Sequence, residues 1–98
     1  MQVTLTFVAA SEGGRKTPAD LSRPAAYRAT VRVENWPKDQ YIGVAIDSGP
    51  VTAEPGEPVR VTMRPIAPSE LSAQLVPGTR FLVHEGPRVV ARGVVEAA

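Results

Sequence analysis

Apolar and polar residues alternate along much of this chain with the period of two that is typical of β-strands. In residues 59–64 every second position is apolar, and arginine or threonine fills the positions between. Two further apolar runs, at residues 81–83 and 89–95, flank the sequence Glu-Gly-Pro at residues 85–87. Glycine and proline favour a reversal and would interrupt a helix. The pattern therefore predicts a strand over residues 59–64 and a β-hairpin formed by residues 80–85 and 88–96.

The first half of the chain shows the same alternation. Residues 2–9 and 26–33 alternate regularly, and residues 41–46 are denser in apolar side chains, so each of these segments is predicted to be a strand. Residues 51–53 are expected to extend an edge. Between Pro65 and Gly78 the period changes, and there we expect a single helical turn, capped by Ser69 and carrying Leu71 and Leu75.

The predicted fold is all-β. Six short antiparallel strands leave two unpaired edges unless the sheet closes, and closure also encloses the apolar faces of the strands. We therefore expect a closed six-stranded antiparallel β-barrel, with Phe81 and Val83 facing inward, and keep a two-sheet sandwich as the alternative.

The composition restricts the classes of function. A chain of 98 residues is expected to form one domain, residues 1–98. The formal net charge of +1 gives no overall attraction to nucleic acid or to an anionic membrane. Without cysteine there is neither a disulfide nor a thiolate metal site, and one histidine makes a zinc site unfavourable. No segment has the pattern of a signal peptide or a membrane span, so we expect a cytoplasmic protein that does not bind membranes.

The residues predict no catalytic site. Gly-Gly-Arg-Lys-Thr at residues 13–17 resembles a phosphate-binding loop only superficially, because its glycines have the wrong spacing and Pro18 prevents a following helix. His84 falls on the strand face opposite Phe81 and Val83, where it is expected to face solvent. No pair of carboxylates stands out as a general acid and base. We expect a protein that is not an enzyme and that binds no nucleotide, cofactor or metal.

Two features of the sequence are candidates for binding, and each has a structural alternative. Arginines gather in the loop after the first strand, on two strand faces and in the final hairpin, and they either form a patch that contacts phosphates or are neutralised by neighbouring acids. The neutralised surface is favoured because the chain has no basic excess. Trp36, in a predicted turn, is either a buried lid on the barrel or an exposed anchor, and the lid is favoured.

Several motifs together resemble the C-terminal β-barrel domain of translation elongation factor Tu. They occur in the order and at nearly the spacing of that family, over almost the entire chain. The resemblance implies a closed six-stranded antiparallel barrel. The motifs are Glu-Gly-Gly-Arg-Lys-Thr-Pro at residues 12–18, Arg-Pro at 23–24, Glu-Pro-Gly-Glu at 54–57, Met-Arg-Pro-Ile-Ala at 63–67, Gly-Thr-Arg-Phe at 78–81, and the hairpin at 84–95.

The resemblance also implies partners. In the family this barrel packs against a GTPase domain and a second barrel, touches the backbone of aminoacyl-tRNA, and meets the nucleotide-exchange factor. The residues that correspond to a tRNA-facing or partner-facing surface are Arg15, Lys16, Arg64, Glu85 and Gly86. The sequence departs from the family pattern at several places: Lys16 replaces a histidine, Ala25 a glutamine, Arg64 a lysine and Pro87 a glycine. The segments around residues 36–47 and 69–74 also differ in length or character.

The chain lacks the GTPase domain, and with it the switch and hydrolysis. We therefore expect a stand-alone, non-catalytic binding module that recognises a protein partner. One alternative is an RNA-binding accessory protein, for tRNA in particular, whose arginine patch would bind weakly, with a Kd of roughly 10⁻⁴ to 10⁻⁶ M. A third possibility is a domain excised from a larger protein.

Overall fold

The computed structural model describes residues 1–97, and most of its regular structure is β-strand. Within these residues no helix is long and apolar enough to cross a membrane. In chain order the elements are β1 (Gln2–Phe7), the 3-10 turn η1 (Ala10–Glu12), β2 (Tyr27–Val33), β3 (Ile42–Ser48), β4 (Val59–Pro65), the 3-10 turn η2 (Ser72–Gln74), β5 (Arg80–Glu85) and β6 (Arg88–Ala97).

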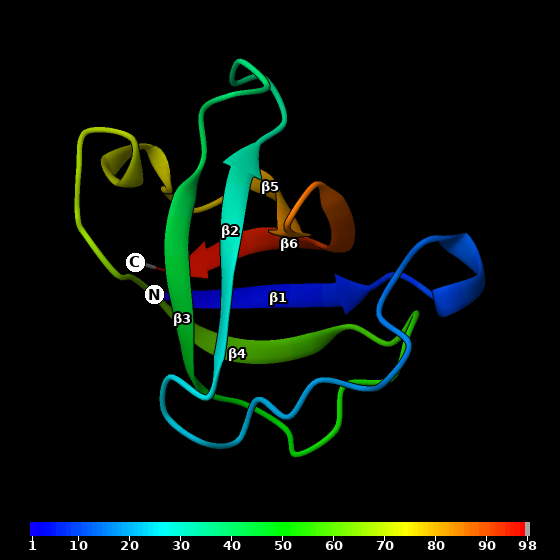
Figure 1. Cartoon of the computed structure of the whole chain (residues 1–98). Helices are drawn as coiled ribbons and strands as arrows, with labels where there is room; N and C mark the ends of the chain where they lie inside the picture. Colours follow the sequence, from blue (N-terminus) through cyan, green and yellow to red (C-terminus); the bar gives the residue numbers. More distant parts are fainter. Residues whose placement is uncertain (98) are drawn as a thin grey trace.

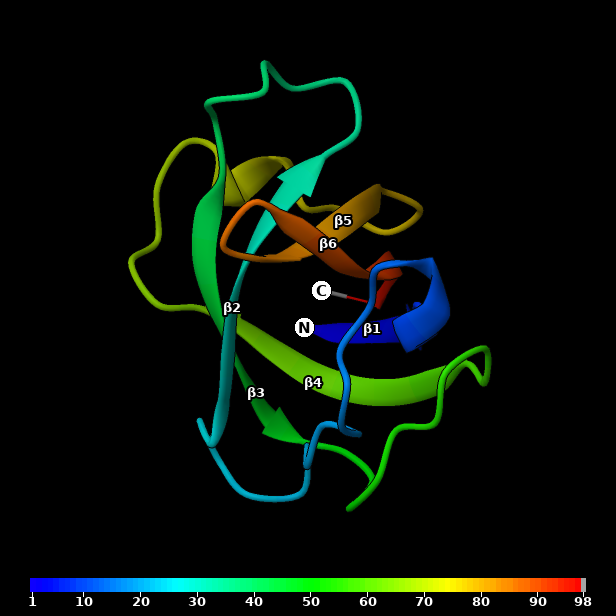
Figure 2. The same cartoon turned by 45° about the vertical axis from the view of Figure 1, so that its right-hand side comes forward.

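The six strands pair antiparallel and close into a barrel in the order β1-β4-β3-β2-β5-β6, with β6 returning to β1 (Figures 1 and 2). The first strand completes the closure, because it pairs with β4 along one edge and with β6 along the other. Closure leaves no strand of the barrel with an unpaired edge. The prediction of a closed six-stranded antiparallel barrel is confirmed, and the sandwich alternative is wrong.

The strands lie within two residues of their predicted ends. The hairpin reverses at Gly86, whose φ of 60° is the positive value that the first position of a type II′ turn requires. A single helical turn forms as η2, but it begins at Ser72, so Leu71 and Leu75 flank it and Leu71, not Ser69, is its N-cap. The Ser69 hydroxyl still accepts a hydrogen bond from the Ser72 amide at 3.3 Å. The edge strand at residues 51–53 is wrong: only Ala53 forms a bridge, with Ala19. Prolines at 50 and 55 explain this, because proline has no amide hydrogen for a ladder.

The barrel interior is filled by apolar side chains from alternate positions of all six strands. Within residues 1–97 no polar or charged residue is buried, and burial of each large apolar side chain stabilises the fold by about 1.5–3 kcal/mol. The largest fully buried side chains are Phe81, Leu5, Leu21, Ile46, Met63, Val3, Val31, Val44, Val90 and Val95.

Loop residues add to this core. Leu21, in the β1–β2 loop, is fully buried next to Gly49, where an added Cβ would lie 2.9 Å from the Leu21 Cβ. Trp36 is 8% exposed, and its Nε1 donates a hydrogen bond to the Gln74 side chain at 2.9 Å. The prediction of a buried Trp36 is confirmed, and the exposed-anchor interpretation is wrong.

Candidate binding surfaces

Glu85 lies at the centre of a cluster that joins three elements. The Oε2 atom of Glu85, at the end of β5, accepts hydrogen bonds of 2.5 Å from Arg15 of the β1–β2 loop and from the Tyr27 hydroxyl of β2. The Arg15 guanidinium also lies 5.4 Å from the centre of the Tyr27 ring. The edge of the Phe7 ring packs against Tyr27, with 6.0 Å between ring centres. These contacts hold the loop against the hairpin.

The cluster shifts the pKa values of its members. Burial tends to raise the pKa of Glu85, but the hydrogen bonds from Tyr27 and Arg15 and the Arg15 charge together lower it. The pKa of Tyr27 is raised, first by burial and then by its hydrogen bond to Glu85. The pKa of Arg15 is also raised, chiefly by the same carboxylate. At neutral pH the cluster is therefore an ion pair with a neutral phenol, and Arg15 is not free to take a phosphate.

Arg64 lies in a separate ion pair. Its Nε is 2.8 Å from Oδ2 of Asp47, and its Nη2 is 3.2 Å from Oδ1, so the contact between β4 and β3 is bidentate. The Arg64 hydrogen bond lowers the pKa of the Asp47 carboxyl. A ligand phosphate would have to displace Asp47 from this pair.

The structure brings four of the five predicted site residues to one region. Arg15 contacts Glu85, exposed Lys16 follows Arg15, and exposed Gly86 forms the hairpin turn after Glu85. A cavity of about 200 Å³ beside them is lined by Arg15 and Lys16 together with Phe7. Arg64 is not part of this region. Whether these residues bind a partner stays a prediction.

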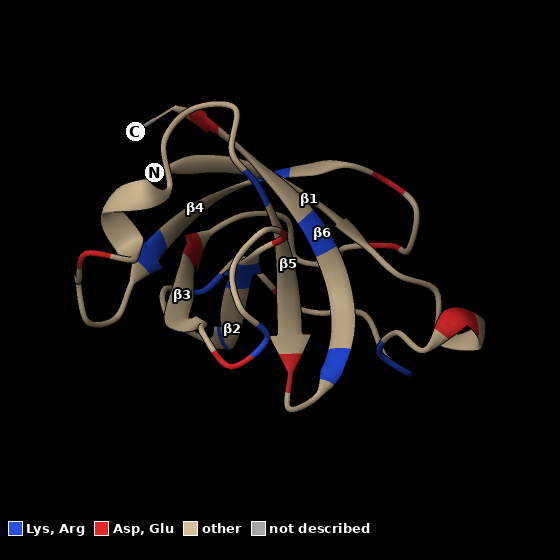
Figure 3. Cartoon of the chain, turned by 90° about the horizontal axis from the view of Figure 1, so that it is seen from above, with Lys and Arg blue, Asp and Glu red and all other residues tan. Residues whose placement is uncertain are grey.

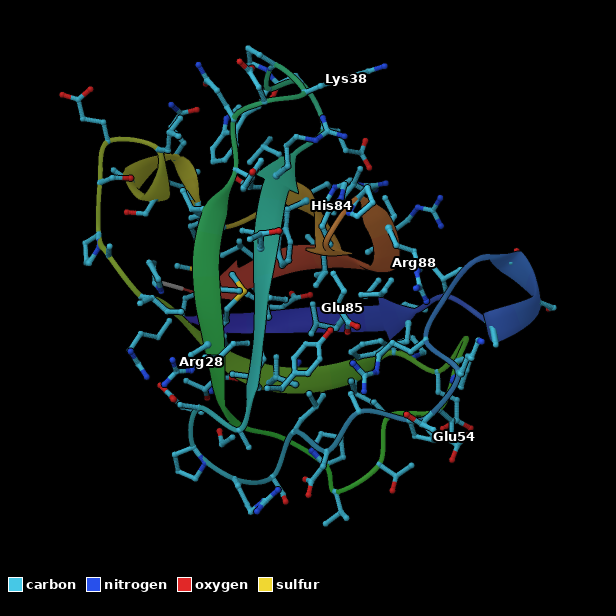
Figure 4. The ribbon with its side chains drawn as sticks, in the orientation of Figure 1. Arg28, Lys38, Glu54, His84, Glu85 and Arg88 are labelled. Carbon is cyan, nitrogen blue, oxygen red and sulfur yellow. The ribbon has the colours of Figure 1, made fainter. Side chains whose placement is uncertain are left out.

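A larger hollow, which we call the basic groove, opens on the outer face of β2 and β5. It has a volume of about 620 Å³. In Figure 4, Lys38 and His84 lie in the upper half of the molecule, whereas Arg28 lies near the opposite end of β2. The groove is lined by Thr30, Arg32, Lys38, Tyr41, His84, Gly86 and Pro87.

His84 lies on the outer face, as predicted, but it is half-buried rather than fully exposed to solvent. Its Nε2 is buried and has no hydrogen-bond partner within residues 1–97. Burial and the nearby Arg32 charge lower the pKa of His84, and a hydrogen bond to the Pro87 backbone opposes this in part. The imidazole is therefore neutral at neutral pH.

The charged residues form a mixed surface with both signs on strands and loops (Figure 3). Arg15, Arg23 and Arg64 each form an ion pair with an acidic side chain. The expectation that neighbouring acids neutralise the arginines is therefore supported at these three positions only.

The sequence did not predict the basic groove, because the residues that line it come from three separate segments. The alternation did place Arg32 on an outer face, but the pairing of Thr30 with His84 is set by the barrel. No protein-family model matches the chain.

Proposed function

We propose that the chain is a non-catalytic binding module, a small barrel that recognises a protein partner with its outer surface. The observation that carries this proposal is the contrast between the interior and the exterior. The interior is packed with apolar side chains, so a ligand has to bind outside. On the outside, Tyr41 is 57% exposed beside the cations Arg32 and Lys38, and Ile66 is 46% exposed. Exposed aromatic and apolar side chains beside arginine are typical of protein interfaces.

The relation to the elongation factor Tu C-terminal barrel is part of the proposal. It is supported by the closed six-stranded antiparallel barrel, the fold that the resemblance implies. The segment at residues 12–18 falls in the loop that meets the hairpin, and Gly86 falls at the hairpin turn. Two segments that carry the resemblance are therefore neighbours in space.

The RNA-binding alternative has weaker support. Two of its three cations, Arg15 and Arg64, already pair with carboxylates, and only Lys16 is exposed without such a pair among the described residues. Neutralising few phosphates gives weak, strongly salt-dependent binding. We therefore place a protein partner first.

The proposal is tested by capture from an extract of the native host, using the full chain with a photo-crosslinker at Lys16 or at Tyr41 and a matched nuclease-treated sample. A discrete cross-linked protein that survives nuclease treatment is the expected result. Recovery of RNA alone, lost when Arg15 and Arg64 are both changed to alanine, would reject the protein-binding module in favour of the RNA-binding accessory.

A further inference from the structure

We propose that the basic groove binds an acidic peptide segment of the partner protein, with carboxylates at Arg32 and Lys38 and an apolar side chain against Tyr41. This inference rests on the proposed function, because it assigns a recognition surface and a ligand class to that binding module. Its cations, Arg32 and Lys38, do not belong to the cluster around Glu85 and Arg15, although Gly86 of the hairpin turn lies beside both.

The pairing of the strands explains why a hollow forms here. Thr30 of β2 pairs with His84 of β5 on one side and with Gly43 of β3 on the other. Gly43 has no side chain, so β3 presents only backbone beside Thr30. The Ile66 side chain lies across this position, with its Cδ1 3.7 Å from where a Cβ of residue 43 would stand. Tyr41 lies two residues before Gly43 and so shares its outward face.

Two cations in the groove are free to bind a ligand. Within residues 1–97 no carboxylate pairs with Arg32 or Lys38, although Glu34 and Asp39 are near them in sequence. Arg32 makes only a long 3.4 Å contact with the Trp36 carbonyl, which leaves most of its donors unused. A guanidinium and an ammonium on one rim attract carboxylates and fix their position.

The groove favours a peptide over a nucleic acid for two reasons. It offers two fixed positive charges, since His84 is neutral at pH 7 because its pKa is lowered. Two neutralised phosphates contribute little to nucleic-acid affinity. The lining is apolar as well as basic, because it includes Pro87 and the exposed side chain of Tyr41. Acidic and apolar groups alternating along a peptide fit such a mixture.

The test uses fluorescence anisotropy with the full chain and three labelled probes. The first probe is a peptide of glutamate and glycine with a central phenylalanine, the second replaces its glutamates with lysine, and the third is an oligouridylate of similar length. The acidic peptide is expected to bind, the lysine peptide is not, and affinity should fall when salt rises from about 50 to 200 mM.

Variants locate the binding site. Arg32→Gln and Lys38→Gln should each weaken binding of the acidic peptide several-fold, and together by about tenfold or more. Arg28→Gln is the matched control, because Arg28 lies on the same strand and face but outside the groove. Tyr41→Ala removes the apolar contact without changing charge and should also weaken binding. Unfolding curves confirm that each variant is folded.

The outcomes separate the two proposals. Weakening in the groove variants, with Arg28→Gln unchanged, supports the inference. Equal weakening by Arg28→Gln, no binding of the acidic peptide, or tighter binding of oligouridylate to the groove overturns it. If the double variant Arg32→Gln, Lys38→Gln still captures the same protein from the host extract as the wild type does, the groove inference fails while the binding module stands. If the wild type captures no protein, the binding module itself fails.

Discussion

At the scale of residues, Glu85 and His84 are neighbours in sequence with opposite environments. One oxygen of Glu85 accepts hydrogen bonds from both Arg15 and Tyr27, whereas the Nε2 of His84 is buried without a partner among residues 1–97. Alternation along β5 predicts that their side chains leave the strand in opposite directions. It does not predict these partners, because Arg15 and Tyr27 are 70 and 58 residues away along the chain.

The Tyr27 hydroxyl should contribute measurably to stability. We expect Tyr27→Phe to lower the free energy of unfolding by about 1–2 kcal/mol, because the substitution removes a hydrogen bond to a partly buried carboxylate. Urea denaturation measures the change. Tyr41→Phe is the matched control, since the Tyr41 ring is 57% exposed and its loss should be less than about 0.5 kcal/mol. Equal losses in the two variants would contradict a role for the Glu85 cluster.

His84 should make stability depend on pH. The pKa of His84 in the folded chain lies below the ordinary value of 6.5, so the unfolded chain binds the proton first as pH falls. The stabilising contribution is therefore present above pH 6.5 and is lost as pH falls through the folded pKa. We expect the free energy of unfolding to decrease from about pH 7.5 to 5.5, and His84→Gln to remove this slope. Parallel pH profiles for the two proteins would show that the histidine is not responsible.

At the scale of elements, the strands and the pairing of β5 with β6 could be predicted from the sequence, and the other strand pairings could not. Alternation located each strand, and Gly86 with Pro87 located the hairpin. Apolar content alone does not predict a strand, as residues 51–53 show. Their apolar side chains suggested a strand, yet only Ala53 forms a bridge. The register of the strands also depends on places where a side chain of one strand packs closely against the backbone of another. The alternation of apolar and polar residues does not show these places. Gly93 of β6, for example, pairs with both Phe81 and Leu5.

Gly93 should resist substitution, because the Phe81 ring occupies the space of its missing side chain. A Cβ at residue 93 would lie 2.3 Å from the Phe81 Cζ and 2.9 Å from a Leu5 methyl. We expect Gly93→Ala to destabilise the barrel by about 1–3 kcal/mol through overpacking. Gly43→Ala is the control: its nearest contact is 3.7 Å, so the change should stay under about 1 kcal/mol. Thermal unfolding of both variants measures the two losses of stability. If Gly93→Ala were as stable as the wild type, the register of β6 with β1 and β5 described above would be wrong.

At the scale of the whole molecule, closure determines where function can lie. The sequence predicted a closed barrel from the cost of exposed edges. It placed Arg15 and Glu85 on one candidate surface only through the family resemblance, and it did not predict their ion pair. It did not predict the basic groove, because Lys38, Tyr41 and His84 come together only when β2 pairs with β3 and β5. Because the interior is packed, the proposed recognition of a partner would take place on the outer surface.

Substitution of Phe81 tests whether the barrel interior is packed as described. Its ring is fully buried and fills the space above Gly93, so we expect Phe81→Ala to lower the free energy of unfolding by about 3–5 kcal/mol. Leu82→Ala, at a half-buried position on the opposite face, should cost less. Chemical denaturation gives both values. A loss below about 1 kcal/mol for Phe81→Ala would mean that the inward face is misassigned.

The most direct test of a barrel that recognises acidic peptides through the basic groove is a map of backbone amide shifts by NMR during titration with the glutamate–phenylalanine peptide. The account predicts that the shifting amides gather at Thr30, Arg32, Tyr41 and Gly86, and that those around Arg28 and Arg60 stay in place. Shifts centred on the loop at Arg15 and Lys16, or spread evenly over the barrel, would contradict it.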